Sequence, residues 1–349
     1  MKYPLLFILF TFCLASCDSN SGPEGSEAAT PEVKFLAPTM VSETEFQLNW
    51  SIVSPVGAQT IAVELSEDSE MSHITKYLDV GDINTDHVLV SNLKGATRYY
   101  YRISLLANGV SLFRSEIASA ETAYQVDNVE LITEDSYSLS GKLAYLESVS
   151  GSRPGIIMMH EFGVWVNPWI GSELMKQLVA EGYVCLTFFF RGHGTSDPVD
   201  DLMDLVNDKS LIAKDLKASI DYMEDNELVS SGELGLMGGS LGAIMALAGN
   251  GYEEVKTSIA LSPTSDGVFV IFPQMTLSSA YYLVGEQDIH TELQGGDFPA
   301  ETQALYDLTE EPRLLDIIEG TADHGTNLLS REELNTSIKE WILEHLPLQ

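Results

Sequence analysis

The chain has 349 residues, 44% of them hydrophobic and 9% aromatic, so it can bury a substantial core in one or two domains. Its 52 acidic residues against 18 basic ones give a formal net charge of −34. A surface this negative argues against nucleic acids and other polyanions as partners. The three cysteines are too few for a disulfide framework.

Residues 1–16 predict a signal peptide. Lys2 supplies a positive start, and the apolar run from Leu5 to Leu14 is too short to span a bilayer. The run ends in Leu-Ala-Ser-Cys, with the cysteine at position 17, which resembles the lipobox of bacterial lipoproteins. The resemblance implies cleavage before Cys17, acylation of Cys17, and a lipid anchor in the bacterial cell envelope, facing the periplasm or the cell surface. An ordinary signal peptide with a cysteine at its cleavage site is the alternative.

Residues 17–31 are rich in Ser, Gly, Glu and Pro, a composition that predicts a flexible tether. The other cysteine left after cleavage, Cys185, lies in the apolar run 183–190. We expect Cys185 to be a small buried side chain of a core strand.

Residues 32–123 alternate apolar and polar side chains with period two. Phe46, Leu48, Trp50 and Ile52 share one parity, and the alternation returns at 61–65 and 99–105. Turn residues separate these runs, and no helical stripe interrupts them. The pattern predicts an all-β antiparallel sandwich.

Two features of this region resemble a fibronectin type III domain. Trp50 stands where that family has its core tryptophan, and residues 93–102 resemble its tyrosine corner, with Tyr99 as the corner residue. An immunoglobulin-like sandwich would have a similar pattern. We expect the sandwich to act as a spacer or as a docking module for an envelope partner.

Residues 125–349 mix the two periods. A hairpin is expected over 129–132 and 139–146, and helical spacing links Ile212, Leu216, Ile220 and Met223. Ser330 and Glu333 predict a capping box at the start of the last helix. Short apolar runs that predict strands buried on both faces lie at 155–159, 184–190, 234–237, 258–261, 280–284 and 314–318. This alternation predicts an α/β fold with a doubly wound, mostly parallel sheet and a site at the carboxyl ends of its strands.

The sharpest local signal is Gly238-Gly-Ser-Leu-Gly242, a G-x-S-x-G motif directly after an apolar strand and before a run of small apolar residues. Glycines at both ends allow a strand-to-helix turn tight enough to expose the hydroxyl of Ser240. This context makes Ser240 a candidate nucleophile.

Two partner residues follow in the order acid, then histidine. Asp288 ends the G-x-x-D segment on the loop after the strand predicted at 280–284, and His324 comes after the strand predicted at 314–318. Glu286, Asp316 and Asp323 are alternatives for the acid, and His193, which precedes the serine in the chain, is a weaker alternative for the base.

This combination resembles the α/β-hydrolase superfamily over about 220 residues. The resemblance implies a Ser240–Asp288–His324 triad and an oxyanion hole made by the N–H groups of Leu241 and Phe162. His160-Glu161 before Phe162 is similar to the dienelactone hydrolase branch, where the nucleophile is commonly a cysteine that the glutamate contacts. Because a serine stands here, a role of Glu161 beyond shaping the loop stays open.

The remaining expectations concern the pocket. Only about 16 residues, 262–277, separate two predicted strands where many relatives insert a helical cap, so the site should be open. The apolar cluster 268–272 could form the wall of the acyl pocket or pack into the core. Trp165 and Trp169 could line the pocket or cover the sheet edge. We expect His160 and His193 to brace loops and His290 to be a surface residue.

No metal-ligand or nucleotide-binding motif is present, so we expect neither a metal nor a cofactor. The sequence thus predicts an envelope-anchored serine hydrolase that cleaves a small-molecule or acyl ester. The alternatives are a binding lipoprotein whose hydrolase-like domain has lost catalysis, and a serine peptidase of the same fold.

Overall fold

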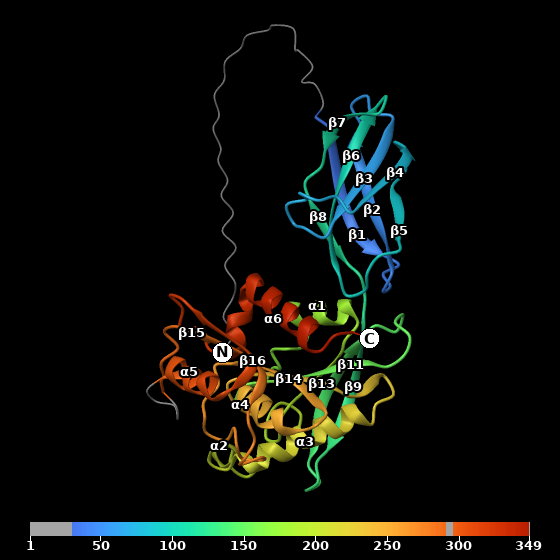
Figure 1. Ribbon diagram of the computed structural model, residues 1–349. Helices are drawn as coiled ribbons and strands as arrows, with labels where there is room; N and C mark the ends of the chain where they lie inside the picture. The colour runs from blue at the N-terminus through green and yellow to red at the C-terminus, as the bar shows by residue number, and fades with distance from the viewer. Residues whose placement is uncertain (1–29, 291–295, 349) are drawn as a thin grey trace, which may run out of the picture.

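The computed structural model describes residues 30–290 and 296–348 (Figure 1). The predicted signal peptide, Cys17 and most of the tether lie outside the described residues. Within them, no helix is both long enough and apolar enough to cross a membrane. An all-β region comes first, and an α/β region follows it.

The all-β region is a sandwich of two antiparallel sheets, as the alternating pattern predicts. One sheet has the order β1-β2-β5; the other has the order β4-β3-β6-β7, and β8 also pairs with β6. The strands are β1 (Glu32–Thr39), β2 (Glu45–Ser54), β3 (Thr60–Ser66), β4 (Lys76–Asp82), β5 (His87–Ser91), β6 (Arg98–Ala107), β7 (Val110–Arg114) and β8 (Ala118–Glu121).

The inward parity of β2 and β6 makes the core of the sandwich. Phe46, Leu48 and Trp50 are buried, and Trp50 Nε1 donates to the carbonyl of Thr85 at 2.9 Å. The hydroxyl of Tyr99 accepts a hydrogen bond from the N–H of Lys94 at 3.0 Å. This bond back to the chain a few residues upstream is the geometry of a tyrosine corner.

Eight of the described strands form the central sheet of the second region, in the order β16-β15-β14-β13-β11-β12-β10-β9. Strands β11 to β16 run parallel, and the predicted hairpin of β9 and β10 is antiparallel at one edge. The strands are β9 (Gln125–Ile132), β10 (Ser138–Tyr145), β11 (Arg153–Met159), β12 (Val184–Phe188), β13 (Val229–Gly239), β14 (Val255–Leu261), β15 (Ser278–Gly285) and β16 (Glu310–Ile318).

Helices cover both faces of this sheet, which is why its central strands are apolar throughout (Figure 1). Helices α3, α4 and α5 pack on one buried cluster, and α1 and α6 pack on another, on the face nearer the sandwich. Cys185 is fully buried in β12, as predicted. The helices are α1 (Glu173–Glu181), α2 (Met203–Asn207), α3 (Lys209–Glu224), α4 (Leu241–Ala248), α5 (Phe298–Leu308) and α6 (Glu332–His345), with 3-10 turns η1 (Gly249–Gly251) and η2 (Gly325–Ser330).

The capping box predicted for the last helix is wrong. Ser330 ends η2, and α6 begins at Glu332 with Arg331 as its N-cap and no side-chain capping bond. Because the 3-10 turn runs almost directly into the helix, Ser330 stands one residue too early to cap it.

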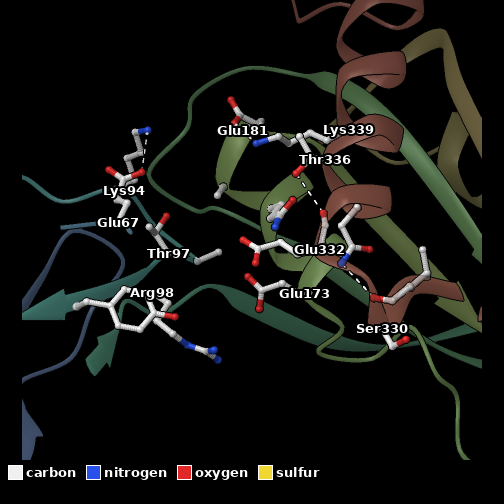
Figure 2. A pocket seen from close by; sticks show the side chains of 16 residues that line it. Glu67, Lys94, Thr97, Arg98, Glu173, Glu181, Ser330, Glu332, Thr336 and Lys339 are labelled. Atoms are coloured by element: carbon white, nitrogen blue, oxygen red, sulfur yellow. Dashed lines mark hydrogen bonds and ion pairs between the residues drawn. The ribbon is translucent and has the colours of Figure 1, made fainter. Parts of the chain in front are cut away.

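The two regions meet in a defined junction. The carboxylate of Glu43 accepts hydrogen bonds from the N–H groups of Glu147 and Ser148, both at 2.9 Å, and Leu146 packs against Gly95. Beside these contacts lies a cavity of about 470 Å³. Its walls carry the ion pair of Lys94 with Glu67 on the sandwich and that of Lys339 with Glu181 on the helices (Figure 2).

Candidate active site

Ser240 occupies a sharp turn between β13 and α4. Its backbone has φ 50° and ψ −111°, a region that a residue with a side chain rarely adopts. The turn is closed by two glycines: a Cβ at position 238 would lie 2.3 Å from the backbone of Gly242, and one at position 242 would lie 2.3 Å from the carbonyl oxygen of Met159. Both glycines of the motif are therefore required sterically, and the strain falls on the serine.

His324 and Asp288 are joined directly. His324 Nδ1 lies 2.9 and 3.0 Å from the two carboxylate oxygens of Asp288, which is fully buried. Asp288 follows β15 and His324 follows β16, so adjacent parallel strands bring them together. A carboxylate bound to Nδ1 leaves Nε2 available as the basic nitrogen of the ring.

Ser262 completes the surroundings of the acid and was missed by the sequence analysis. Its hydroxyl donates to Asp288 Oδ2 at 2.6 Å and accepts from the N–H of Gly325 at 3.0 Å. It follows β14 with φ 55°, so three neighbouring strands contribute to one hydrogen-bonded cluster. The available signal was its place directly after the predicted strand 258–261.

The three alternative acids have other partners. Glu286 accepts from the N–H of Gly320, Asp316 from the hydroxyl of Tyr281, and Asp323 from Arg331. None of these carboxylates is bonded to His324. Asp288 is thus the acid that the structure brings to the histidine.

His290 differs from the expectation of a simple surface residue. Although 42% of its side chain is exposed, its Nε2 lies 3.1 Å from Asp288 Oδ1, at an angle that makes no hydrogen bond. Asp288, His290 and His324 thus stand close enough for a metal ion. However, Nδ1 of His324 is already hydrogen-bonded to Asp288, so the group fits an acid–imidazole pair better than an open ligand set.

Ser240 and His324 line the same cavity, of about 220 Å³, at the carboxyl ends of the strands. Within the described residues the imidazole is bonded to Asp288, and no hydrogen bond joins it to the Ser240 hydroxyl. The remaining lining residues are five apolar ones, Phe162, Val206, Leu241, Ile244 and Phe298, and four polar or charged ones, Glu161, Lys209, Thr264 and Asp266.

The expected acyl wall at 268–272 is wrong for this cavity. The loop after β14 contributes Thr264 and Asp266, whereas Val268 is fully buried and its neighbours pack on the core. Neither tryptophan lines the cavity: Trp169 is buried in the core, and Trp165 is 63% exposed. As expected from the short segment 262–277, no helix covers the site there.

The two predicted oxyanion donors, Leu241 and Phe162, line the same cavity as Ser240. Leu241 is the first residue of α4, where helix N–H groups are unpaired, and Phe162 lies in the loop after β11. Neither amide donates to a protein group in the part of the chain that the structure describes. Both N–H groups are thus unpaired in the described residues, and their role as oxyanion donors stays a prediction.

His160 and His193 brace this loop, as expected. His193 Nε2 accepts from the N–H of Gly163 at 2.9 Å, and His160 Nε2 accepts from the N–H of Phe190 at 3.1 Å. Burial lowers the pKa of His160 to about 3 and also lowers the pKa of His193. Both rings are therefore neutral acceptors at neutral pH and hold the Phe162 backbone in place.

Comparison with known proteins agrees with this architecture. Residues 142–298, which include Ser240 and Asp288 but end before His324, match the Dienelactone hydrolase family. The hypothetical protein PA2218 from Pseudomonas aeruginosa has a similar structure, with 14% identity and a TM-score of 0.51 over 64% of this chain and 94% of its own. No curated protein sequence matches the chain.

Two further solved structures cover the same share of this chain, 64%. The esterase Pf2001 from Pyrococcus furiosus is 21% identical, with 94% of its own chain covered and a TM-score of 0.48. A dienelactone hydrolase from Anabaena variabilis is 16% identical, with 99% covered and a TM-score of 0.48. The strand order of the sheet and the family match over residues 142–298 show that the second region has the α/β-hydrolase fold.

Proposed function

We propose that the chain is a serine hydrolase that cleaves a carboxylic ester through an acyl-enzyme. His324 Nε2 removes the proton of Ser240 as its oxygen attacks the ester carbonyl, and then protonates the leaving alcohol. Asp288 holds the imidazole with Nδ1 protonated and stabilises the imidazolium. The N–H groups of Leu241 and Phe162 bind the oxyanion. Water then attacks the acyl-enzyme in the same way and releases the carboxylic acid and the free serine.

One observation carries this proposal: a serine on a strained strand-to-helix turn faces the same cavity as a histidine bound to a fully buried aspartate. A buried carboxylate costs free energy unless it is bonded, and here its donors are His324 and Ser262. A role confined to binding would not require the strained serine and the acid–imidazole pair in one cavity.

The cavity supports a small substrate. Its volume of about 220 Å³ lies below the roughly 300–1,000 Å³ typical of pockets for drug-sized ligands. We therefore propose esters with a short acyl chain, the alcohol portion extending out through the uncapped mouth.

Hydrolysis of p-nitrophenyl esters of increasing acyl length, together with aminoacyl substrates, tests the reaction and separates an esterase from a peptidase. The purified chain should hydrolyse the acetate and butyrate esters, and Ser240→Ala should lower kcat by at least about a thousandfold. Ser337→Ala on α6, which is not among the residues that line the cavity, is the matched control and should keep wild-type kcat.

A fluorophosphonate probe provides the second measurement, because it labels only a serine activated by a base. Labelling of the wild type at Ser240, and none of Ser240→Ala, is the expected result. A folded wild-type chain that neither labels nor hydrolyses any ester would instead be a binding protein with an inert hydrolase fold.

We also propose that the protein is anchored in the bacterial cell envelope by lipid on Cys17, and that its sandwich is of the fibronectin type III kind. The lipobox-like sequence supports the first proposal. The buried Trp50 and the bond from the Lys94 N–H to Tyr99 support the second. Metabolic labelling with a fatty acid that is lost in Cys17→Ala, with release of the protein from the membrane fraction, tests the anchor.

A further inference from the structure

Glu161 lies where the nucleophile strand and the histidine loop meet. Its Oε1 accepts two hydrogen bonds from Thr326, one from the backbone N–H at 2.6 Å and one from the hydroxyl at 2.5 Å. Thr326 is two residues after His324, and Glu161 is one residue before Phe162. The bond therefore ties the loop of the base to the loop of the proposed oxyanion donor.

Two glycines make room for this carboxylate. A Cβ at position 239, directly before Ser240, would lie 2.4 Å from Glu161 Oε1 and 3.0 Å from the Thr326 N–H. A Cβ at position 325, directly after His324, would lie 2.6 Å from the same oxygen. The carboxylate is thus enclosed by the immediate neighbours of both the serine and the histidine.

The separation of Ser240 from His324 depends on such backbone attachments, because no hydrogen bond joins their side chains within the described residues. From the contacts of Glu161 we propose that it is a positioning residue, which fixes the His324 loop against the nucleophile turn through Thr326. This inference rests on the proposed function. It gives Glu161, whose role the sequence left open, a function different from the contact with a cysteine nucleophile that is common in the dienelactone hydrolase branch.

In this proposal, the Glu161 oxygen that accepts from Thr326 positions the His324 loop, and the negative charge of the carboxylate is not required. The second oxygen, Oε2, is buried without a partner in the described part of the chain. Glu161→Gln keeps an acceptor for both Thr326 donors and loses the charge, whereas Glu161→Ala loses the acceptor. Thr326→Val loses only the hydroxyl donor and keeps the N–H.

We expect kcat for p-nitrophenyl acetate to fall between about tenfold and a hundredfold in Glu161→Ala, with KM within about threefold, because a displaced base slows the chemical step more than binding. Glu161→Gln should stay within about fivefold of wild type, and Thr326→Val should fall between the two. The effects of Glu161→Ala and Thr326→Val should be less than additive in the double variant, since they remove the same contact.

Fluorophosphonate labelling separates positioning from a purely structural role. A displaced His324 lowers the labelling rate of every molecule, whereas partial unfolding lowers the final extent and leaves the rate of the folded fraction unchanged. A lower rate with full extent is the expected result for Glu161→Ala. If Glu161→Ala does not fold, the other two variants test the inference: Glu161→Gln should then keep a higher kcat than Thr326→Val.

Labelling of Glu161→Ala at the wild-type rate would overturn the inference, as would a loss in Glu161→Gln as large as in Glu161→Ala. Both outcomes leave the proposed function intact, because the wild type still labels at Ser240. If the wild type itself fails to label, the proposed function and this inference fall together.

Discussion

The two cavities described above differ in size and in content, and the larger one has the weaker claim to chemistry. The junction cavity, about 470 Å³, is lined by exposed charges in loose ion pairs such as Lys339 with Glu181 at 3.5 Å. The cavity of about 220 Å³ holds a strained serine and a histidine bonded to a buried acid. Surface ion pairs cost little to form and contribute little, whereas strain and buried charge persist only where the surrounding structure holds them. Volume alone therefore does not identify a catalytic site.

After the loss of Ser240 itself, the largest expected effect lies in the backbone of the smaller cavity. Gly242→Ala places a methyl group 2.3 Å from the carbonyl oxygen of Met159, which is backbone and cannot turn away. We expect kcat to fall by at least about a hundredfold, because the turn that carries Ser240 must shift. Alanine favours a helix over glycine by about 1 kcal/mol, so loss of helix propensity cannot explain the result.

Ester hydrolysis with far-UV circular dichroism as the control for folding measures this effect. A Gly242→Ala chain with wild-type kcat would show that the nucleophile turn tolerates displacement. The contrast between a cavity held by strain and buried charge and a junction of loose ion pairs would then fail.

His160, buried beside the smaller cavity, should make stability depend on pH. Its pKa is about 3 in the folded chain because of burial, against an ordinary value of 6.5. As the pH falls below 6.5, the His160 imidazole becomes protonated in the unfolded chain but stays neutral in the folded chain. The stabilisation is therefore complete above about pH 6.5 and is lost progressively toward pH 3. The loss reaches a few kcal/mol, at about 1.4 kcal/mol for each pH unit.

Urea unfolding at pH 7, 6, 5 and 4 measures this dependence in the wild type and in His160→Gln. The variant is less stable at pH 7, because it loses the packed imidazole, but its free energy of unfolding should fall less steeply below pH 6.5. Both chains have the same acidic surface, so its contribution cancels when their free energies of unfolding are subtracted. Parallel slopes would mean that His160 is not buried in its neutral form.

The sequence predicted most of the fold because local pattern and burial agree there. Continuous apolar runs became the buried parallel strands β11 to β15, and the alternating parity of Phe46 and Trp50 became the core of the sandwich. The proposed nucleophile, acid and base were found by their places at strand ends, where parallel topology gathers side chains.

What the sequence could not predict depends on contacts between distant segments. The bond of Ser262 to Asp288 spans 26 positions, and the bonds of Glu161 to Thr326 span 165. An apolar run such as 268–272 predicts burial but not which cavity it faces. The junction could not be predicted from the sequence either, because a single glutamate in a loop belongs to no periodic pattern.

The smallest expected effect on catalysis lies at that junction. Glu43→Ala removes the acceptor of the Glu147 and Ser148 N–H groups and should lower stability by about 1–3 kcal/mol. It should leave kcat and KM for a short ester unchanged, because these contacts are separate from the cavity of Ser240.

Burial raises the pKa of Glu43, but its hydrogen bonds lower it further, so the net pKa lies below the usual 4.5. A carboxylate whose pKa is depressed stabilises the fold above its unfolded pKa and loses that effect as the pH falls.

Thermal unfolding of wild type and Glu43→Ala at pH 7 and pH 4 should therefore show a difference that shrinks at the lower pH. Gly95→Ala is the matched variant for packing at the same junction: its Cβ would meet the end of the Leu146 side chain at 2.4 Å, a group that can rotate away. Its cost should be smaller than that of Glu43→Ala and independent of pH. A fall in kcat in either variant would mean that the sandwich and the catalytic cavity are coupled, because neither position lines the cavity. The two cavities would then belong to one functional unit, with the junction acting on the reaction through the packing of α1 and α6 against the sheet.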